Sequence, residues 1–189
     1  MDDDTIGLHP GGMETSSGLY INPLDPDPKL ITAQDIAHHL SLICRFRGAC
    51  KWHYSVAQHS IYVSDMLNMM GESTINQLAG ILHDAAEAYL GDVIRPIKHL
   101  DAAKPLRLAE HRLQAVINKK FGVEDADWKL IKDIDNMVIG AEARQLMPSG
   151  GRGWKNLPAP ADIKITRLPP DVVESWFLAQ LSNLMRRLS

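Results

Sequence analysis

The sequence predicts an all-α protein that folds as a single helical bundle. Apolar residues recur at spacings of three and four in six segments, so that each segment carries one apolar face. The one candidate strand, residues 163–165, is too short to matter, and we see no internal repeat. A chain of 189 residues fits one domain and is long enough to bury a sizeable core.

The N-terminal part of the sequence is its least regular part. Residues 1–18 are rich in Gly, Ser and Asp, and we expect them to be mobile. Residues 20–28 contain three prolines, which fix φ and remove hydrogen-bond donors, so this stretch predicts an extended arm that lies on the domain. The domain itself is expected to occupy residues 19–189.

Three helices are predicted in the first half of the chain. Thr32 can cap a helix that ends near Ile43. A second helix is expected over residues 55–70. A third is expected over residues 74–91, because Gly91 suits the left-handed position at a helix C-terminus.

Three more helices are predicted in the second half. They cover residues 103–121, residues 128–146 and a C-terminal stretch that begins after Pro169–Pro170. The segment 149–160 contains three glycines and two prolines. It therefore predicts a loop, and this loop is a candidate lid.

Composition and charge exclude several classes of function. The net charge of −3 leaves no broad basic surface, so we expect no nucleic-acid polymer as a partner. No apolar run approaches the roughly 20 residues that span a bilayer, and the acidic N-terminus is not a signal peptide. We expect Cys44 and Cys50 to be reduced thiols that pack inside the protein, and a disulfide between them is the alternative. We expect a cytoplasmic protein, in the host cytoplasm if it is viral.

Titratable residues interrupt the apolar third helix. On a helix, His83 and Glu87 are four residues apart and Asp84 and Glu87 three apart, so these side chains lie near one another. Asp92 follows the helix end and can turn back toward them. Burying such a group is costly without a cation, and imidazole with carboxylate suits Zn²⁺, Mn²⁺, Fe²⁺ or Co²⁺ better than Ca²⁺. The alternative is a solvated helix face with a capping aspartate.

Two other helices each add a candidate ligand. His59 lies near the start of the second helix, and consecutive helices with short connections are antiparallel neighbours, so His59 and His83 can meet. A lone histidine there is more often a satisfied core residue. Asp135 lies beside the apolar face of the fifth helix, which is unusual without a partner. Asp133 is turned well away and is expected to be solvated.

The order His59, His83–Asp84, Asp135 resembles the H…HD…D signature of the HD superfamily of metal-dependent phosphohydrolases. Neighbouring segments resemble the 5′-deoxynucleotidase-like branch and a subgroup that includes phage dATP triphosphohydrolases. The resemblance covers residues 19–147. Its segments are 57–60 (AQHS), 82–93 (LHDAAEAYLGDV) and 95–98 (RPIK) for the branch, and 24–28 (LDPDP), 35–41 (DIAHHLS) and 44–46 (CRF) for the subgroup.

This resemblance implies a single HD-domain helical bundle that binds a divalent metal ion, whether Zn, Mn, Co, Fe or Mg. Glu87 matches a catalytic position and is expected to hold the nucleophile or to hydrogen-bond a ligand. Asp92 is expected to handle protons near the leaving oxygen, and an exchange of these two roles stays open. The implied metal ligands are His59, His83, Asp84 and Asp135.

The resemblance also implies residues that bind the substrate. Arg45 and Lys98 match phosphate-binding positions, with Arg47 and Arg95 as competitors for these roles. For any one of these cations, a solvated surface charge is the alternative. Tyr20 is the first candidate for a wall against a nucleobase.

Trp52 and Trp154 also lie in or beside irregular segments where an aromatic ring could stack on a base. In most proteins such aromatic residues are packing residues.

The function implied is metal-dependent hydrolysis of the 5′ phosphoester of a (deoxy)nucleotide, with dATP, giving deoxyadenosine and triphosphate, as the favoured case. One alternative is a 5′-deoxynucleotidase that acts on dNMPs. Another is a non-catalytic metal-binding or nucleotide-sensing helical module. A hydrolase of cyclic dinucleotides would be expected to carry extra motifs that are not visible here. A small-molecule nucleotide is the expected partner, and we expect a homo-oligomer.

Overall fold

The computed structural model describes residues 9–10 and 12–188, and this part of the chain is mostly helical, as predicted. The longer helices are α1 (Ala33–Leu42), α2 (Val56–Met69), α3 (Thr74–Leu82), α6 (Lys104–Phe121), α7 (Trp128–Leu146) and α8 (Pro170–Leu188). The shorter elements are β1 (Met13–Glu14), β2 (Tyr20–Ile21), η2 (Arg45–Gly48), α4 (Glu87–Leu90), α5 (Arg95–Lys98) and η3 (Asp101–Ala103).

Short polar side chains fix where four of the helices begin. Each accepts a hydrogen bond from the backbone N–H three residues later, which satisfies a donor that has no partner within the helix. The prediction that Thr32 caps α1 is confirmed. The four capping residues are Thr32 for α1, Ser55 for α2, Ser73 for α3 and Asp127 for α7.

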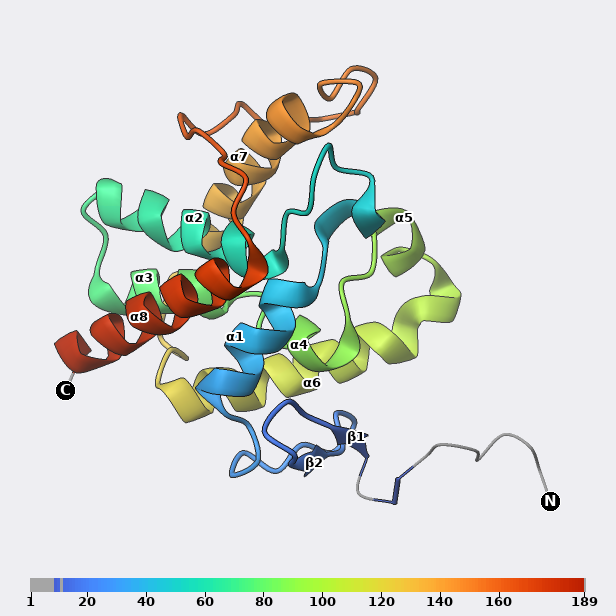
Figure 1. Ribbon diagram of the computed structural model, residues 1–189, viewed down its shortest axis with the longest axis vertical. Helices are drawn as coiled ribbons and strands as arrows, with labels where there is room; N and C mark the ends of the chain where they lie inside the picture. The colour runs from blue at the N-terminus through green and yellow to red at the C-terminus, as the bar shows by residue number, and fades with distance from the viewer. Residues whose placement is uncertain (1–8, 11, 189) are drawn as a thin grey trace.

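Helix α2 runs through the middle of the bundle and packs against α1, α3, α7 and α8. Figure 1 shows α8 lying across α1 and α3. The contact between α2 and α3 is especially close, because a Cβ atom added at Gly80 would lie 2.5 Å from Leu67 Cδ1. The two helices run antiparallel, so the first turn of α2 lies beside the end of α3, which is where the candidate ligands lie.

The predicted helix over residues 74–91 is interrupted. Helix α3 ends at Leu82, turns follow, and α4 begins at Glu87. The cause is Gln114 on α6, whose Nε2 donates to the carbonyl of Leu82 (2.8 Å) and whose Oε1 accepts from the N–H of Ala86 (3.0 Å). In a continuous α-helix these two backbone groups would bond to each other, so the inserted amide breaks the helix.

The described part of the N-terminal segment makes specific contacts with the rest of the chain. Residues 1–8 and 11 lie outside the described residues. Strand β1, which precedes the expected start of the domain at residue 19, pairs with β2, which follows it. Ser16 and Ser17 donate hydrogen bonds to the buried carboxylate of Asp35, which Thr32 also binds. These donors satisfy the buried carboxylate of Asp35 and attach Ser16 and Ser17 to α1.

Three smaller expectations can also be compared with the structure. No strand forms at residues 163–165. Cys44 and Cys50 are both free thiols. Within the described residues, no helix is long and apolar enough to cross a membrane.

Candidate metal centre

Four side chains from three parts of the bundle converge on one point. His59 comes from α2, His83 and Asp84 from the turn after α3, and Asp135 from α7. His59 Nε2 lies 3.3 Å from His83 Nε2 and 3.1 Å from Asp135 Oδ1. Asp84 Oδ2 lies 3.2 Å from His83 Nε2. We call these four residues the His–Asp cluster.

The spacing of the donor atoms fits a divalent metal ion. With bonds of about 2.1 Å, neighbouring ligand atoms lie roughly 3.0–3.4 Å apart and opposite ones roughly 4.2 Å apart. The three distances above fall in or near the first range. Two others approach the second range, at 3.9 Å for His59 Nε2 to Asp84 Oδ2 and 4.0 Å for His83 Nε2 to Asp135 Oδ1. His59, His83 and Asp84 can therefore hold a metal ion together, and Asp135 is within reach of two of them.

Both imidazole rings are held with Nε2 facing the cluster. His83 Nδ1 lies 2.8 Å from the carbonyl of Gly80, which can only accept, so Nδ1 carries a proton and Nε2 is the nitrogen that faces the cluster. His59 is fully buried, and its Nδ1 lies 2.7 Å from a carboxylate oxygen of Glu142. Such hydrogen bonds on the far nitrogen are typical of metal-binding histidines.

The charges in and around the His–Asp cluster strongly shift the pKa values of its members. Burial and the Arg45 charge lower the pKa of His59, but Glu142 and Asp135 outweigh them and raise that pKa to about 9. Burial opposes ionisation of Asp84 and Asp135, yet the neighbouring histidines hold the pKa of both carboxyls well below the ordinary range. The carboxylates are therefore ionised, and a cation, whether a proton or a metal ion, is required among them.

Glu87 and Asp92, the two predicted catalytic residues, lie next to the cluster. Burial raises the pKa of Glu87 to about 9, with Asp84 and Asp92 adding to the effect. Burial likewise raises the pKa of Asp92. Glu87 Oε1 accepts a hydrogen bond from Lys98 (3.3 Å), whereas Oε2 is buried and has no hydrogen-bond partner within the described residues.

The two predicted phosphate-binding residues are both paired with carboxylates. Arg45 is buried, donates from Nη2 to Glu142 (3.0 Å), and places Nη1 3.7 Å from Asp84 Oδ2. Lys98 donates to Glu110 (2.7 Å) as well as to Glu87.

Two exposed cations approach the cluster from the surface. Lys132 Nζ lies 2.5 Å from Asp135 Oδ2 with 61% of its side chain exposed, and Arg95 Nη2 lies 4.0 Å from the same oxygen with 56% exposed. The sequence analysis missed Lys132 and Glu142. A signal existed for each, since Lys132 lies three residues before Asp135 and Glu142 seven after it, and these spacings place them on one helix face.

Two of the aromatic residues considered for base stacking, Tyr20 and Trp154, contact different parts of the chain. Tyr20 stacks on His9 with ring centroids 3.7 Å apart, and the Glu14 carboxylate raises the pKa of Tyr20, so these contacts join Tyr20 to the N-terminal segment. Trp154, in the 149–160 loop, lies 5.9 Å from Phe46, whose ring lies 5.3 Å from Arg45 Cζ. The loop thus meets the chain next to Arg45.

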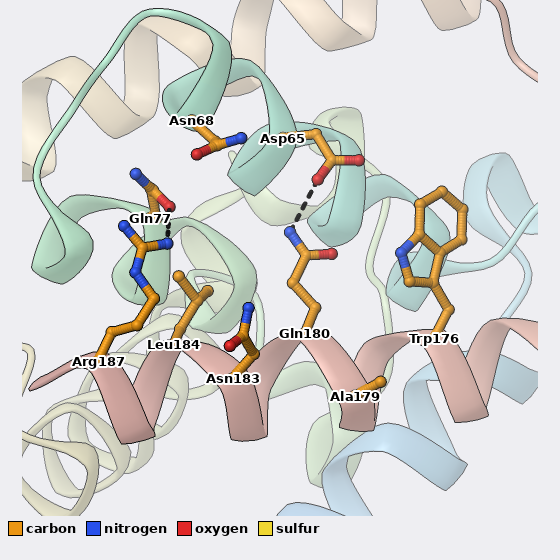
Figure 2. Close-up of a pocket in the computed structure, with 9 residues that line it drawn as sticks. All are labelled: Asp65, Asn68, Gln77, Trp176, Ala179, Gln180, Asn183, Leu184 and Arg187. Carbon is orange, nitrogen blue, oxygen red and sulfur yellow. Dashed lines mark hydrogen bonds between the residues drawn. The ribbon is translucent and has the colours of Figure 1, made fainter. Parts of the chain in front are cut away.

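A separate polar groove lies between α2, α3 and α8 (Figure 2) and has a volume of about 370 Å³. Its polar groups largely bond one another, since Gln180 donates to Asp65 and Arg187 donates to Gln77. The groove contains no member of the His–Asp cluster. It is lined by Asp65, Asn68, Gln77, Trp176, Ala179, Gln180, Asn183, Leu184 and Arg187.

No protein-family model matches the chain. The chain is 30% identical over 177 residues to YfdR of Escherichia coli (strain K12), an alignment that covers 91% of this chain and 94% of YfdR. The chain belongs to the YfdR family. It is also 33% identical over 189 residues to RCAP_rcc00048 of Rhodobacter capsulatus, covering 92% of this chain and 95% of that protein. Both relatives match this chain over nearly their full length. Both are described as uncharacterized, so membership of the family assigns no reaction to the chain.

Proposed function

We propose that the chain is a metal-dependent phosphohydrolase of the HD type that cleaves the 5′ phosphoester of a (deoxy)nucleotide. The His–Asp cluster carries this proposal. It joins two imidazole Nε2 atoms and two carboxylates at ligand-to-ligand distances, and each imidazole is fixed by a hydrogen bond at Nδ1. A divalent metal bound there supplies Lewis acidity toward a phosphoryl oxygen and toward water.

In this proposal His59, His83, Asp84 and Asp135 hold the metal ion. Glu87 Oε2, which is buried and unpaired among the described residues, is the atom that we assign to hold the attacking water. Water adds to the phosphorus, the bond from phosphorus to O5′ breaks, and O5′ takes a proton. Asp92, beside Glu87, is our candidate to handle that proton.

The cations at the cluster support a phosphate substrate. Arg45 and Lys98 are already bonded to carboxylates, so they set the local charge and leave limited capacity for a substrate. Arg95 and Lys132 are more than half exposed and lie at the surface edge of the cluster. We infer that these two meet the outer phosphates of a bound nucleotide, for which a guanidinium and an ammonium are suitable donors.

The test is product analysis by chromatography with a panel of NMPs, dNMPs, NTPs and dNTPs, each with Mn²⁺, Co²⁺, Zn²⁺ or Mg²⁺ added separately. We expect dATP to give deoxyadenosine and triphosphate. Release of phosphate from dNMPs alone would make the protein a 5′-deoxynucleotidase. Metal binding without turnover of any nucleotide would refute the hydrolase and favour the non-catalytic module.

The same preparation tests the expected assembly. The homo-oligomer stays a prediction, and light scattering coupled to size-exclusion chromatography would measure the mass against that of the 21.0 kDa chain.

A further inference from the structure

Glu142 is a fully buried carboxylate at the centre of an ionic network. It lies on α7 and receives hydrogen bonds from two segments distant in sequence. Its Oε1 lies 2.7 Å from His59 Nδ1, and its Oε2 accepts from Arg45 Nη2 at 3.0 Å. A buried charge is costly to desolvate and is retained where its partners need it. The two partners of Glu142, His59 and Arg45, therefore indicate what this carboxylate does.

The first partner is a member of the His–Asp cluster. Because a carboxylate only accepts, His59 donates from Nδ1, and this bond fixes both the tautomer and the rotation of the ring. Nε2 then faces His83 and Asp135, where a bound metal ion would replace its proton. Without the carboxylate, the ring could exchange its protonated nitrogen or turn away from the cluster.

The second partner reaches a second member of the cluster. The guanidinium of Arg45 donates to Glu142 on one side and lies 3.7 Å from Asp84 Oδ2 on the other. The backbone N–H of Arg45 is bonded to the carbonyl of Tyr54, and the next two residues, Phe46 and Arg47, have φ of 52° and 54°. Non-glycine residues rarely adopt this conformation, and it persists where surrounding structure holds the chain.

We propose that Glu142 is a positioning residue of the metal centre. It orients His59 directly and Asp84 through Arg45, so that one carboxylate on α7 aligns ligands from α2 and from the turn after α3. This inference rests on the proposed function, in that it takes the His–Asp cluster to bind a divalent metal ion.

Titration with Co²⁺ tests the proposal without using hydrolysis, because Co²⁺ bound to nitrogen and oxygen ligands has a visible absorption spectrum. For Glu142→Gln we expect a Co²⁺ affinity 10–100-fold lower than that of the unchanged protein, and an altered spectrum. The matched control is Asp65→Asn, which also turns a carboxylate into an amide. Asp65 is bonded to Gln180 in the groove of Figure 2 and should leave Co²⁺ affinity unchanged.

A double variant separates positioning from simple charge balance. Arg45→Met combined with Glu142→Gln removes both buried charges, so thermal stability should recover even if Glu142→Gln alone folds poorly. If Glu142 positions the ligands, the double variant keeps the weakened affinity and the altered spectrum. Recovery of the original affinity and spectrum would overturn the proposal.

The remaining outcomes are distinct. Unchanged Co²⁺ binding by Glu142→Gln would sink the positioning role and leave the proposed function standing. Failure of the unchanged protein to bind Co²⁺ or any other divalent metal would overturn both.

Discussion

Gln114 holds open the break in the helix that carries His83 and Asp84, and its removal gives the sharpest test of this structure. Gln114→Leu keeps a similar volume and removes the amide that lies between Leu82 and Ala86. If the turn keeps its shape, the buried N–H of Ala86 loses its partner, whereas the Leu82 carbonyl still accepts from the N–H of Ala85. One unsatisfied buried donor costs roughly 1–3 kcal/mol, so the expected loss of unfolding free energy is about 1–3 kcal/mol.

The chain has one alternative response to Gln114→Leu. The Leu82 carbonyl and the Ala86 N–H could bond to each other and close a continuous helix, which would preserve much of the stability. Closure would rotate His83 and Asp84 relative to His59. The Co²⁺ affinity would then fall, whereas the unfolding free energy would change little. Urea unfolding and Co²⁺ titration, carried out on the same protein, measure both responses.

Gln180→Leu is the matched control for Gln114→Leu. Gln180 is also a glutamine that links helices, since its amide donates to Ser64 and Asp65, but it lies in the groove of Figure 2. We expect it to cost stability without changing Co²⁺ affinity. The reasoning about the helix break fails if Gln114→Leu keeps both the stability, within about 0.5 kcal/mol, and the Co²⁺ affinity of the unchanged protein.

Three further predictions concern single side chains. Hydrogen bonds outweigh burial and hold the pKa of Asp35 at about 2, against 3.8. This difference corresponds to about 2 kcal/mol of stability, which is present above pH 4 and is lost as the pH falls toward 2. Asp35→Asn should therefore lower stability at pH 7, and its deficit in urea unfolding should shrink below pH 4; a deficit constant with pH would contradict this. Lys132→Met should raise KM about tenfold with little change in kcat, because it removes a cation beside the substrate, while Lys129→Met serves as control and an unchanged KM would argue against the contact. His83→Ala should abolish metal content and activity together, whereas Glu87→Ala should lose turnover and keep metal, and an active Glu87→Ala would remove its assigned role.

The sequence was sufficient for most helices and for the members of the cluster. Helix starts were visible because caps such as Thr32 act on residues three positions away, and the apolar faces repeat locally. His59 and Asp135 could be found because each interrupts or adjoins an apolar face, and such residues need a partner.

The features that the sequence did not predict depend on long-range contacts. Ser16 and Ser17 bond Asp35 on α1, about 18 residues away, and nothing in the sequence marks these residues as partners. The stacking of Tyr20 on His9 is likewise not visible in the sequence. Glu142 resembled an ordinary helix carboxylate because its partners, Arg45 and His59, lie 97 and 83 residues away.

The break between α3 and α4 determines how His83 and Asp84 face each other. Adjacent residues on a regular α-helix project about 100° apart and do not face one another. Here His83 Nε2 and Asp84 Oδ2 lie 3.2 Å apart, in a stretch where Ala85 bonds Leu82 and Glu87 bonds Asp84 in the tighter i to i+3 pattern. A tightened stretch within a helix often marks a functional hinge or local strain. The amide from α6 therefore contributes to the site indirectly, because it bonds the backbone on either side of the turn where His83 and Asp84 meet.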